Sequence, residues 1–475
     1  MRLTQRLGKM GRFEIGSYRN IFMGLRFLLL TVSLLQTFLN ISYASTELSK
    51  SSATLASQKA TPSLKPWYHQ IESLWSGHLK TRGSVSYPDE ESFFRALDTN
   101  PLYDASIDFR LQNILIFSSR LSFETAYEVI LFGGDTWQVT NELADRYPDL
   151  FNDILIPLAS LNDDRRLMDL TQTIIEDDHY VLYHRLDRFF LTFRPKWGVI
   201  RAGRQAITWG NGFLFNPMDL FNPFSPTNIE RDYKVGEDML VTQFSIDKIG
   251  DFEFLYVPRR DPMNHNVEWD QSSLAGKLHF FSGTSEFDIM VSKHYEDEVI
   301  GLGSRGYLGN TAWRLDATWT FLNGDNDTDD FLSLVANMDY SWVWWQKNLY
   351  GFIEFYYNGL GNDQLSEAYR ELAIIERFAR GEMFTFGRTY MSGEIQMELH
   401  PLFRMYLTAI QNLSDASGTL QPRAIWDVTA NTRFTFGAFI TYGEHGSEFG
   451  GFRIPQTDFI HKSSNSAFVW FTWYF

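Results

Sequence analysis

Several common features are missing from this sequence. It has no cysteine, so no disulfide framework holds the fold together. Lysine and arginine number 42 against 58 aspartates and glutamates, and the net charge of −16 makes nucleic acid a poor partner. The longest apolar run, residues 27–39, has 13 residues. A membrane-spanning helix needs about 20, so its absence excludes a helical membrane protein.

The amino-terminal residues have the order of an export signal. A basic stretch precedes the apolar run, and Ser42-Tyr43-Ala44 offers small residues at the recognition positions of a cleavage site. We expect a signal peptide at residues 1–44 and a flexible periplasmic lead at residues 45–74, which begins rich in Ser, Ala, Thr and Lys. An uncleaved signal anchor is the alternative.

Residues 75–475 show the two-residue alternation of β-strands. In residues 311–321, for example, Trp313 and Leu315 fall on one face and Asp316 on the other. This pattern predicts strands with an apolar outer face and a polar inner face. About 18 strands result, with 16 as the second choice. They lie near residues 75–86, 106–117, 120–132, 180–194, 198–208, 239–248, 251–258, 271–281, 285–294, 297–307, 311–321, 331–341, 348–358, 387–399, 402–413, 423–430, 433–442 and 467–475.

The connections between these strands favour a transmembrane barrel. In residues 387–399, Ile395 is expected outward and Gln396 inward, and the last ten residues alternate in the same way. A strand in lipid must be paired on both sides, so we predict a closed antiparallel β-barrel. Short turns alternate with long loops, and all fifteen prolines fall outside the predicted strand interiors. A soluble β-sandwich is the alternative.

Three long connections carry further signals. Residues 147–173 and 363–380 have helical spacing, which predicts short helices in extracellular loops. Residues 209–238 are rich in Pro and Phe, which indicates a folded loop. We expect this third outer loop to fold into the lumen and narrow it; a position across the outer rim is the alternative. The expected constriction residues are Trp209, Asn211, Phe215, Asp219, Phe221, Arg231 and Lys234.

A resemblance rests on one motif and its upstream companions. Arg201-Ala-Gly-Arg204-Gln205-Ala-Ile-Thr-Trp209-Gly-Asn-Gly212 runs into Phe215-Asn216-Pro217-Met-Asp219-Leu-Phe221-Asn222-Pro223, after Asp163-Asp164-Arg165-Arg166 and Leu186-Asp187-Arg188. This set resembles a poorly characterised group of bacterial outer-membrane β-barrels, porin-like and alginate-export-like. The resemblance implies a place in the outer membrane of a Gram-negative bacterium, and no particular substrate.

The expected partners follow from that location. They are outer-membrane lipid and lipopolysaccharide, the barrel assembly machinery and a small-molecule solute, with a homo-oligomer as an option. Serine and histidine show no catalytic trio, and the histidines show no metal-ligand spacing, so we expect no enzyme, no metal and no cofactor. The acidic residues 325–330 are either a solvated loop or a loose divalent cation site; Asp330 stands where an EF-hand needs glycine.

Charges of both signs fall on the predicted inner faces. Facing rows of acidic and basic residues set selectivity in porins, whereas the alternative is ordinary solvation of the lumen. The residues expected to line a pore are Arg110, Glu124, Glu128, Lys277, Arg314, Asp316, Glu354, Arg388, Glu394, Glu398 and Arg404. The leading hypothesis is a porin-like channel for passive diffusion of small hydrophilic or ionic solutes. A closed barrel with a structural or surface-binding role is second, and uptake of apolar molecules is third.

Overall fold

The structure, a computed structural model, describes residues 71–95, 100–146, 162–223, 233–246, 249–323, 329–455 and 457–475. The expected signal peptide and residues 45–70 of the lead lie outside these ranges, as do Arg231 and the acidic residues 325–328. The first strand begins at Glu72, so residues 72–74, which the sequence places in the lead, are part of the sheet.

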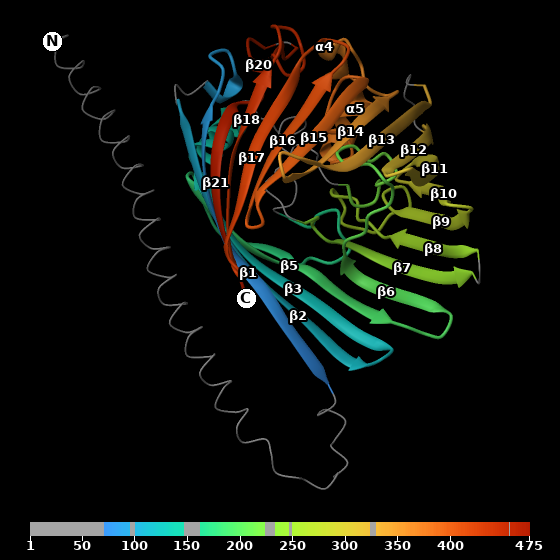
Figure 1. The fold of residues 1–475 in the computed structure, drawn as a ribbon. Helices are drawn as coiled ribbons and strands as arrows, with labels where there is room; N and C mark the ends of the chain where they lie inside the picture. Colours follow the sequence, from blue (N-terminus) through green and yellow to red (C-terminus); the bar gives the residue numbers. More distant parts are fainter. Residues whose placement is uncertain are drawn as a thin grey trace, which may run out of the picture. The chain divides into compact units, whose positions relative to one another are not determined.

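Eighteen antiparallel strands form one closed barrel (Figure 1). Strand β1 pairs with β2 on one side and with β21, the last strand, on the other, which closes the ring. The barrel strands are β1 (Glu72–Tyr87), β2 (Leu102–Ser118), β3 (Leu121–Gly134), β5 (Tyr180–Phe193), β6 (Gly198–Gln205), β7 (Glu237–Ile246), β8 (Gly250–Val257), β9 (Ser273–Ser282), β10 (Ser285–His294), β11 (Asp297–Leu308), β12 (Thr311–Phe321), β13 (Phe331–Trp344), β14 (Lys347–Asn358), β15 (Thr389–His400), β16 (Phe403–Asn412), β17 (Gly418–Thr429), β18 (Thr432–Tyr442) and β21 (Asn465–Tyr474).

The predicted barrel of 18 strands is confirmed, and each predicted strand overlaps an observed one. One additional strand, β4 (Thr171–Asp177), pairs with Tyr180–Arg185 of β5, the part of β5 that β6 does not reach. The prediction that all prolines lie outside strand interiors is wrong for one residue, because Pro422 lies inside β17. The pairing of β17 with β18 stops at Leu420 and resumes at Arg423, so the proline occupies a break in that ladder, where its missing N–H costs no bond.

The two ends of the barrel differ in their connections. Turns of a few residues, such as those after β2, β9, β11 and β13, lie at the end where β1 begins and β21 finishes. The long loops lie at the opposite end, which we call the loop end. Two of its nine connections are short: residues 295–296 after β10, already an exception in the sequence, and residues 413–417 after β16. The chain therefore has the alternation that bacterial outer-membrane barrels show.

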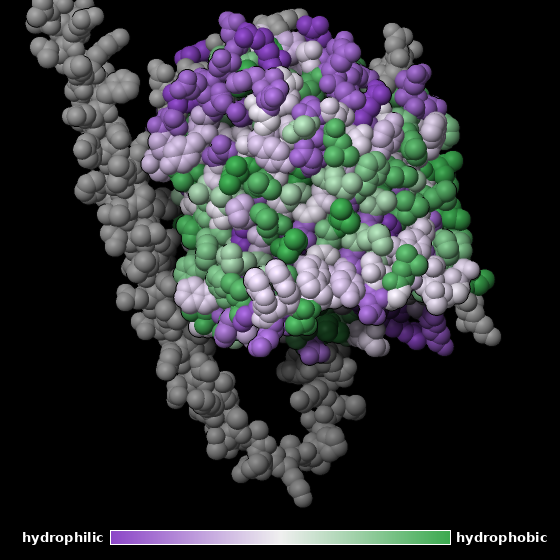
Figure 2. Space-filling model, turned by 45° about the horizontal axis from the view of Figure 1, so that its top comes forward, coloured by the Kyte–Doolittle hydropathy of each residue, from purple (hydrophilic) through white to green (hydrophobic). Residues whose placement is uncertain are grey.

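The outer wall carries an apolar belt. Outward side chains on distant strands are exposed and apolar, including Val291 on β10, Leu302 on β11, Ile353 on β14 and Val469 on β21. Figure 2 shows hydrophobic residues in a band around the wall, below a hydrophilic top. Exposed aromatic residues gather near the short turns, among them Trp197, Phe281, Tyr307, Trp344 and Trp345. Such a belt, with an aromatic girdle at its edge, is the surface that lipid covers.

Helices occur only in the loops among the described residues. They are η2 (Phe93–Arg95), α2 (Asp135–Arg146), α4 (Leu365–Ala368) and α5 (Leu372–Ala379). The helical prediction for residues 363–380 is confirmed by α4 and α5. The prediction that residues 147–173 are partly helical lies mostly outside the described residues; residues 162–170 form no helix, and β4 follows. No described helix has the length and apolar character needed to cross a membrane.

Four loops share a hydrophobic core at the loop end. Phe93 from the β1–β2 loop, Leu143 from α2, Ile374 from α5 and Phe452 from the β18–β21 loop belong to one buried cluster. The last of these loops contains a small hairpin, β19 (Phe452–Arg453) with β20 (Ile460–His461). Shared burial fixes these loops against each other, because separating them would expose apolar surface to water.

The two faces of the wall give the first test. Ile395 lies outward on β15 and is 52% exposed, whereas its neighbour Gln396 faces the lumen. We expect Ile395→Arg to lower the free energy of unfolding by about 2–4 kcal/mol if the site lies near the bilayer midplane, because lipid solvates the charge poorly. The matched variant Gln396→Arg should change it by about 0.5 kcal/mol or less. Denaturant titration of both barrels in lipid vesicles measures the difference, and equal losses would mean that the faces are reversed.

Candidate functional site

The connection between β6 and β7 turns into the barrel instead of away from it. In Figure 1 it is the green segment inside the ring of strands. Its first part, residues 206–223, begins with a tight turn in which the Asn216 side chain donates a hydrogen bond to the Trp209 carbonyl at 2.9 Å. Gly210 has a φ of +89°, which favours glycine, and a Cβ at Gly212 would lie 1.8 Å from the Phe215 carbonyl oxygen. We call residues 206–223 the crossing segment.

Two carboxylates across the lumen from β6 hold the crossing segment. The first is Asp316 on β12, which is fully buried. It accepts hydrogen bonds from the backbone N–H of Asn211 at 2.5 Å and from the Asn211 side chain at 2.7 Å. Asn337 on β13 donates to the Asn211 carbonyl at 3.1 Å, so one residue of the segment is bonded to two neighbouring strands.

The second carboxylate is Glu354 on β14, which is also fully buried. It accepts the backbone N–H groups of Phe213, Leu214 and Phe215 at 2.6, 3.0 and 2.9 Å, and the Asn337 side chain at 3.2 Å. A buried carboxylate is costly without partners, and buried N–H groups are costly without acceptors. Here each satisfies the other, so removing Glu354 would leave three N–H groups of the segment unpaired.

Aromatic contacts reinforce these hydrogen bonds. Phe213 stacks on Phe352 with ring centroids 4.4 Å apart, and Phe215 stacks on Tyr356 at the same distance. Phe215 also lies 5.5 Å from the ring of Tyr390 on β15. Two predicted pore-lining cations contact the same segment: Arg314 lies over Phe213, and Lys277 lies over the ring of Trp209.

The returning end of the connection is held on the opposite side, at β2, β3 and β5. The Tyr233 ring lies 4.0 Å from the Arg110 guanidinium, and its hydroxyl hydrogen-bonds to Glu128. Arg188 donates to the Lys234 carbonyl at 2.9 Å. Asp187 accepts the backbone N–H of Gly236 at 2.9 Å. The connection therefore spans the lumen between two charged walls.

The residues that carry the sequence motif meet in one buried network. Arg204, at the end of β6, donates to Asp163 and Asp238, each at 2.9 Å. Asp163 also accepts from Arg166 at 2.7 Å. Burial alone would raise the pKa of Asp163, but Arg166 and Arg204 outweigh it and lower that pKa to about 2. Segments far apart in sequence are thus joined where the crossing segment begins.

A second ion pair lies inside the connection itself. Asp219 and Lys234 form an ion pair between its two halves, and the Lys234 ammonium also donates to the Ile207 carbonyl at 3.0 Å. Burial raises the pKa of Asp219 to about 6, and Lys234 offsets only part of that rise. Burial likewise lowers the pKa of Lys234. The pair ties the outgoing and returning halves together.

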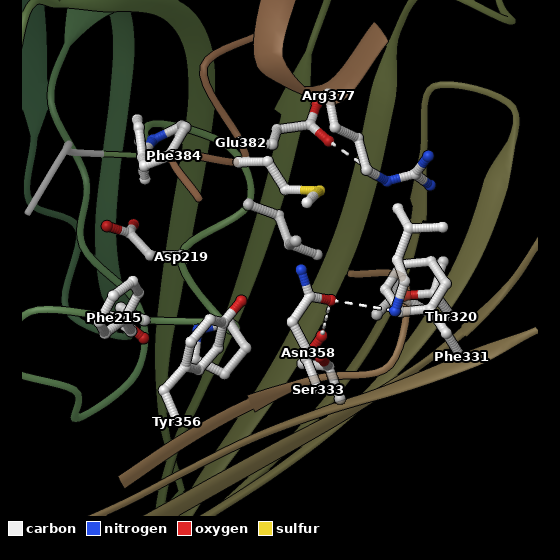
Figure 3. A pocket seen from close by; sticks show the side chains of 18 of the residues that line it. Phe215, Asp219, Thr320, Phe331, Ser333, Tyr356, Asn358, Arg377, Glu382 and Phe384 are labelled. Carbon is white, nitrogen blue, oxygen red and sulfur yellow. Dashed lines mark hydrogen bonds and ion pairs between the residues drawn. The ribbon is translucent and has the colours of Figure 1, made fainter. Parts of the chain in front are cut away.

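A cavity with a volume of about 80 Å³ lies between the crossing segment and the strands β10–β14 (Figure 3). Phe215 and Asp219 border it from the segment, and Tyr356 borders it from the wall. Glu382 and Phe384, from the β14–β15 loop, border it on another side. It mixes aromatic faces with polar groups, as solute sites do.

One hydrogen-bonded chain near this cavity has the composition of a catalytic trio. Ser273 Oγ lies 2.9 Å from His294 Nδ1, and His294 Nε2 lies 3.0 Å from Glu382 Oε1. The serine is 1% exposed and accepts a hydrogen bond from Arg259 at 2.6 Å, so no substrate reaches it in this conformation. Burial would raise the pKa of Glu382, but His294, Arg380 and Arg377 lower it to about 2. The chain connects β9 and β10 to the β14–β15 loop.

The structure separates the predicted pore-lining residues into two groups. Arg110, Glu128, Lys277, Arg314, Asp316 and Glu354 contact the connection between β6 and β7. The others lie elsewhere: Glu124 accepts from Gln112, Arg404 pairs with Asp427, Glu394 accepts from Thr408, Glu398 lies opposite Arg404, and Arg388 precedes β15 and donates to the Gly361 carbonyl. A role of either group in selectivity stays a prediction.

The predicted constriction residues lie on this connection, apart from Arg231, which is outside the described residues. Trp209, Phe215 and Phe221 are buried, and Trp209 donates its indole N–H to Glu253 on β8. Sequence reasoning missed Asn337 and Asp238 as anchors. Asp163, Asp187 and Arg204 were identified only as members of the sequence motif. Their presence in one motif was the available signal, but the spacing of residues along the chain does not show which side chains of separate segments form ion pairs.

Comparison with known proteins gives matches of structure only. No family model matches the chain, and no curated protein matches it in sequence. OccAB1 of Acinetobacter baumannii has a TM-score of 0.47 at 8% identity, covering 85% of this chain and 96% of its own. OccK5 (OpdH) of Pseudomonas aeruginosa has 0.47 at 9%, covering 84% and 98%. Wzi of Escherichia coli, described as a carbohydrate-binding β-barrel involved in group 1 capsule assembly, has 0.47 at 8%, covering 83% of both chains.

At these identities and TM-scores, the matches assign nothing to this chain. The chain itself forms a closed antiparallel barrel with an even number of strands and an apolar belt, which are the features of a barrel that spans the outer membrane. Its architecture is that of a bacterial outer-membrane β-barrel. The expectations of a transmembrane barrel and of an outer-membrane location are thereby confirmed.

The motif network predicts a pH dependence. The folded state keeps Asp163 ionised down to about pH 2, whereas the unfolded chain protonates it near its ordinary value of 3.8. The stability that Asp163 contributes is therefore present above about pH 4 and lost as the pH falls towards 2. We expect Asp163→Asn to lower the free energy of unfolding by about 2 kcal/mol at neutral pH and to match the wild type near pH 2.

Denaturant titration across this pH range measures the effect. Asp164→Asn is the matched control, because Asp164 is exposed and adjacent. A difference between Asp163→Asn and the wild type that stays constant with pH would contradict the assignment.

Proposed function

We propose that the protein is a porin-like channel through which small hydrophilic or ionic solutes diffuse across the outer membrane, with residues 209–238 as its constriction. Passage would need no cofactor or energy input. The observation that carries the proposal is the anchoring of Asn211 and Phe213–Phe215 by Asp316 and Glu354, across the lumen from the strand where the connection begins. A connection fixed in this way occupies cross-section that a solute would otherwise use.

The length of the connection supports the same proposal. Adjacent strands lie only about 4.8 Å apart, so closing the turn between β6 and β7 needs few residues. The rest is surplus, and its described part is held by the wall: Glu354 accepts three of its backbone N–H groups, and Phe213 and Phe215 stack on wall rings. Long ordered loops of this kind are usually functional.

The second candidate, a closed barrel with a structural or surface-binding role, would use the same anchors to seal the lumen. A conductance measurement separates the two. In either case the protein would be inserted by the barrel assembly machinery and surrounded by lipid and lipopolysaccharide.

Replacing Gly212–Lys234 with a short Gly/Ser linker should raise single-channel conductance several-fold. The change removes Phe213–Phe215 and the rest of the segment beyond Asn211, while Glu354 gains water in place of its three lost N–H partners, so the barrel can still fold. Planar-bilayer recording of the purified protein measures the effect.

The control is the same linker in place of residues 262–266, an exposed part of the β8–β9 loop. It should leave conductance unchanged. A folded Gly212–Lys234 replacement with wild-type conductance would show that the connection does not limit passage, and absence of any conductance in both proteins would favour the sealed barrel.

Charge reversal on the lumen wall tests selectivity. Glu394 accepts a hydrogen bond from Thr408 at 2.6 Å and lies 3.5 Å from Arg423, but it does not anchor the crossing segment among the described contacts. We expect Glu394→Lys to shift the reversal potential in a salt gradient towards anion preference with the barrel still folded. Glu298→Lys, with the outward orientation of Ile300 and Leu302 on β11, should leave it unchanged. Equal shifts for both variants would mean that Glu394 does not face the permeation path.

A further inference from the structure

A second cavity, with a volume of about 270 Å³, lies at the loop end of the lumen, between β18, β21 and the loops above them. Seven of its eleven lining residues are phenylalanine or tryptophan. We call it the aromatic chamber. Small-molecule sites are mostly apolar with a few polar groups, and the chamber has such a lining.

The wall side of the chamber breaks the rule that the inside of a barrel is polar. Phe439 on β18 and Phe468 and Trp470 on β21 all line the chamber. Their neighbours two residues away on the same face are polar, such as Thr441 and Thr472. Phe468 and Trp470 are stacked with centroids 4.6 Å apart, so they present a continuous aromatic surface.

This surface is not needed to hold the loops. None of the three wall residues belongs to the hydrophobic clusters that the described residues form. Phe439 and Phe468 are partly exposed, so their rings are available to a solute, and stacking on a ring adds affinity beyond burial. Trp470 is 4% exposed and has the Lys80 ammonium 4.4 Å from its ring centroid, so it supports Phe468 from behind.

The polar groups of the chamber carry no free charge. The Glu448 carboxylate accepts hydrogen bonds from the Phe386 backbone at 2.6 Å, from Tyr390 at 2.5 Å and from Asn412 at 2.8 Å, which satisfies it internally. His461 lies 3.2 Å from the Tyr369 hydroxyl, and burial lowers its pKa to about 4, so the ring is neutral at neutral pH. An ionised solute would therefore lose water without gaining a counter-charge.

The chamber is next to the cavity over the crossing segment. Phe384 lines both, so the loop that contains it is the partition between them. We propose that the aromatic chamber binds uncharged, ring-bearing solutes with a small polar group, before they reach the crossing segment. Binding at the chamber rests on its own geometry, and only the order of passage rests on the proposed channel.

The test uses the full-length barrel in lipid nanodiscs and tryptophol, an uncharged indole alcohol, as the probe. Isothermal titration, corrected with empty nanodiscs, should show one saturable site. Phe439→Ala and Phe468→Ala should each weaken binding tenfold or more, because each removes a ring from the wall. Phe436→Ala is the matched control: the same change on the same strand, but at an outward residue that is 41% exposed. It should bind like the wild type.

Three outcomes would overturn the proposal: no saturable binding by the wild type, equal loss in Phe439→Ala and Phe436→Ala, or tighter binding of methyl glucoside, an uncharged sugar, than of tryptophol. Far-ultraviolet circular dichroism and heat-modifiable mobility establish that each variant is folded. Conductance is recorded on the same preparations. Absence of tryptophol binding by the wild type with intact conductance would reject the chamber and leave the channel, whereas wild-type binding without conductance would reject the channel and leave the chamber.

Discussion

Every backbone N–H and C=O of a spanning segment must find a partner within the protein, because lipid offers none. Pairing of β1 with β21 meets this requirement for the whole wall at once. The two-residue period then places one side chain in lipid and the next in the lumen all around the ring. The apolar belt and the polar inner wall are both consequences of that closure. A substitution that disturbs the β1–β21 seam would therefore act on all eighteen strands, not on one hairpin.

The same requirement governs the inside of the barrel. A segment that enters the lumen takes its backbone polar groups away from bulk water, and the wall must replace that water. Glu354 does so with one carboxylate for three consecutive N–H groups, and Asp316 does so for Asn211. A carboxylate is suited to this task because its two oxygens accept several hydrogen bonds and charge strengthens each of them. The inner wall is thus a set of specific acceptors and not only a solvated surface.

The sequence was sufficient to predict the barrel wall, because the alternation of apolar and polar residues is a local signal. Ile395 outward and Gln396 inward follow from period two alone, and the same rule locates the eighteen strands. The sequence was insufficient to predict which residues hold the segment inside the lumen. Asp316 and Glu354 were expected inside, yet nothing local distinguishes a carboxylate that faces water from one that receives backbone N–H groups of a segment more than 100 residues away. The prediction that prolines lie outside strand interiors was wrong for Pro422 for a related reason. The break in the β17–β18 ladder that accommodates this proline depends on the partner strand.

The carboxylates of the inner wall differ in role because they differ in burial. Asp316 and Glu354 are fully buried and saturated, so they are poor candidates for interacting with a passing ion, although they fix the segment that such an ion would meet. Glu394 is partly exposed to the lumen and has fewer partners, so its field reaches the solution. In the proposed channel, fully buried carboxylates would fix the width of the pore, and partly exposed ones would set its charge preference. Changes in conductance and changes in selectivity should then map to different residues on the same wall.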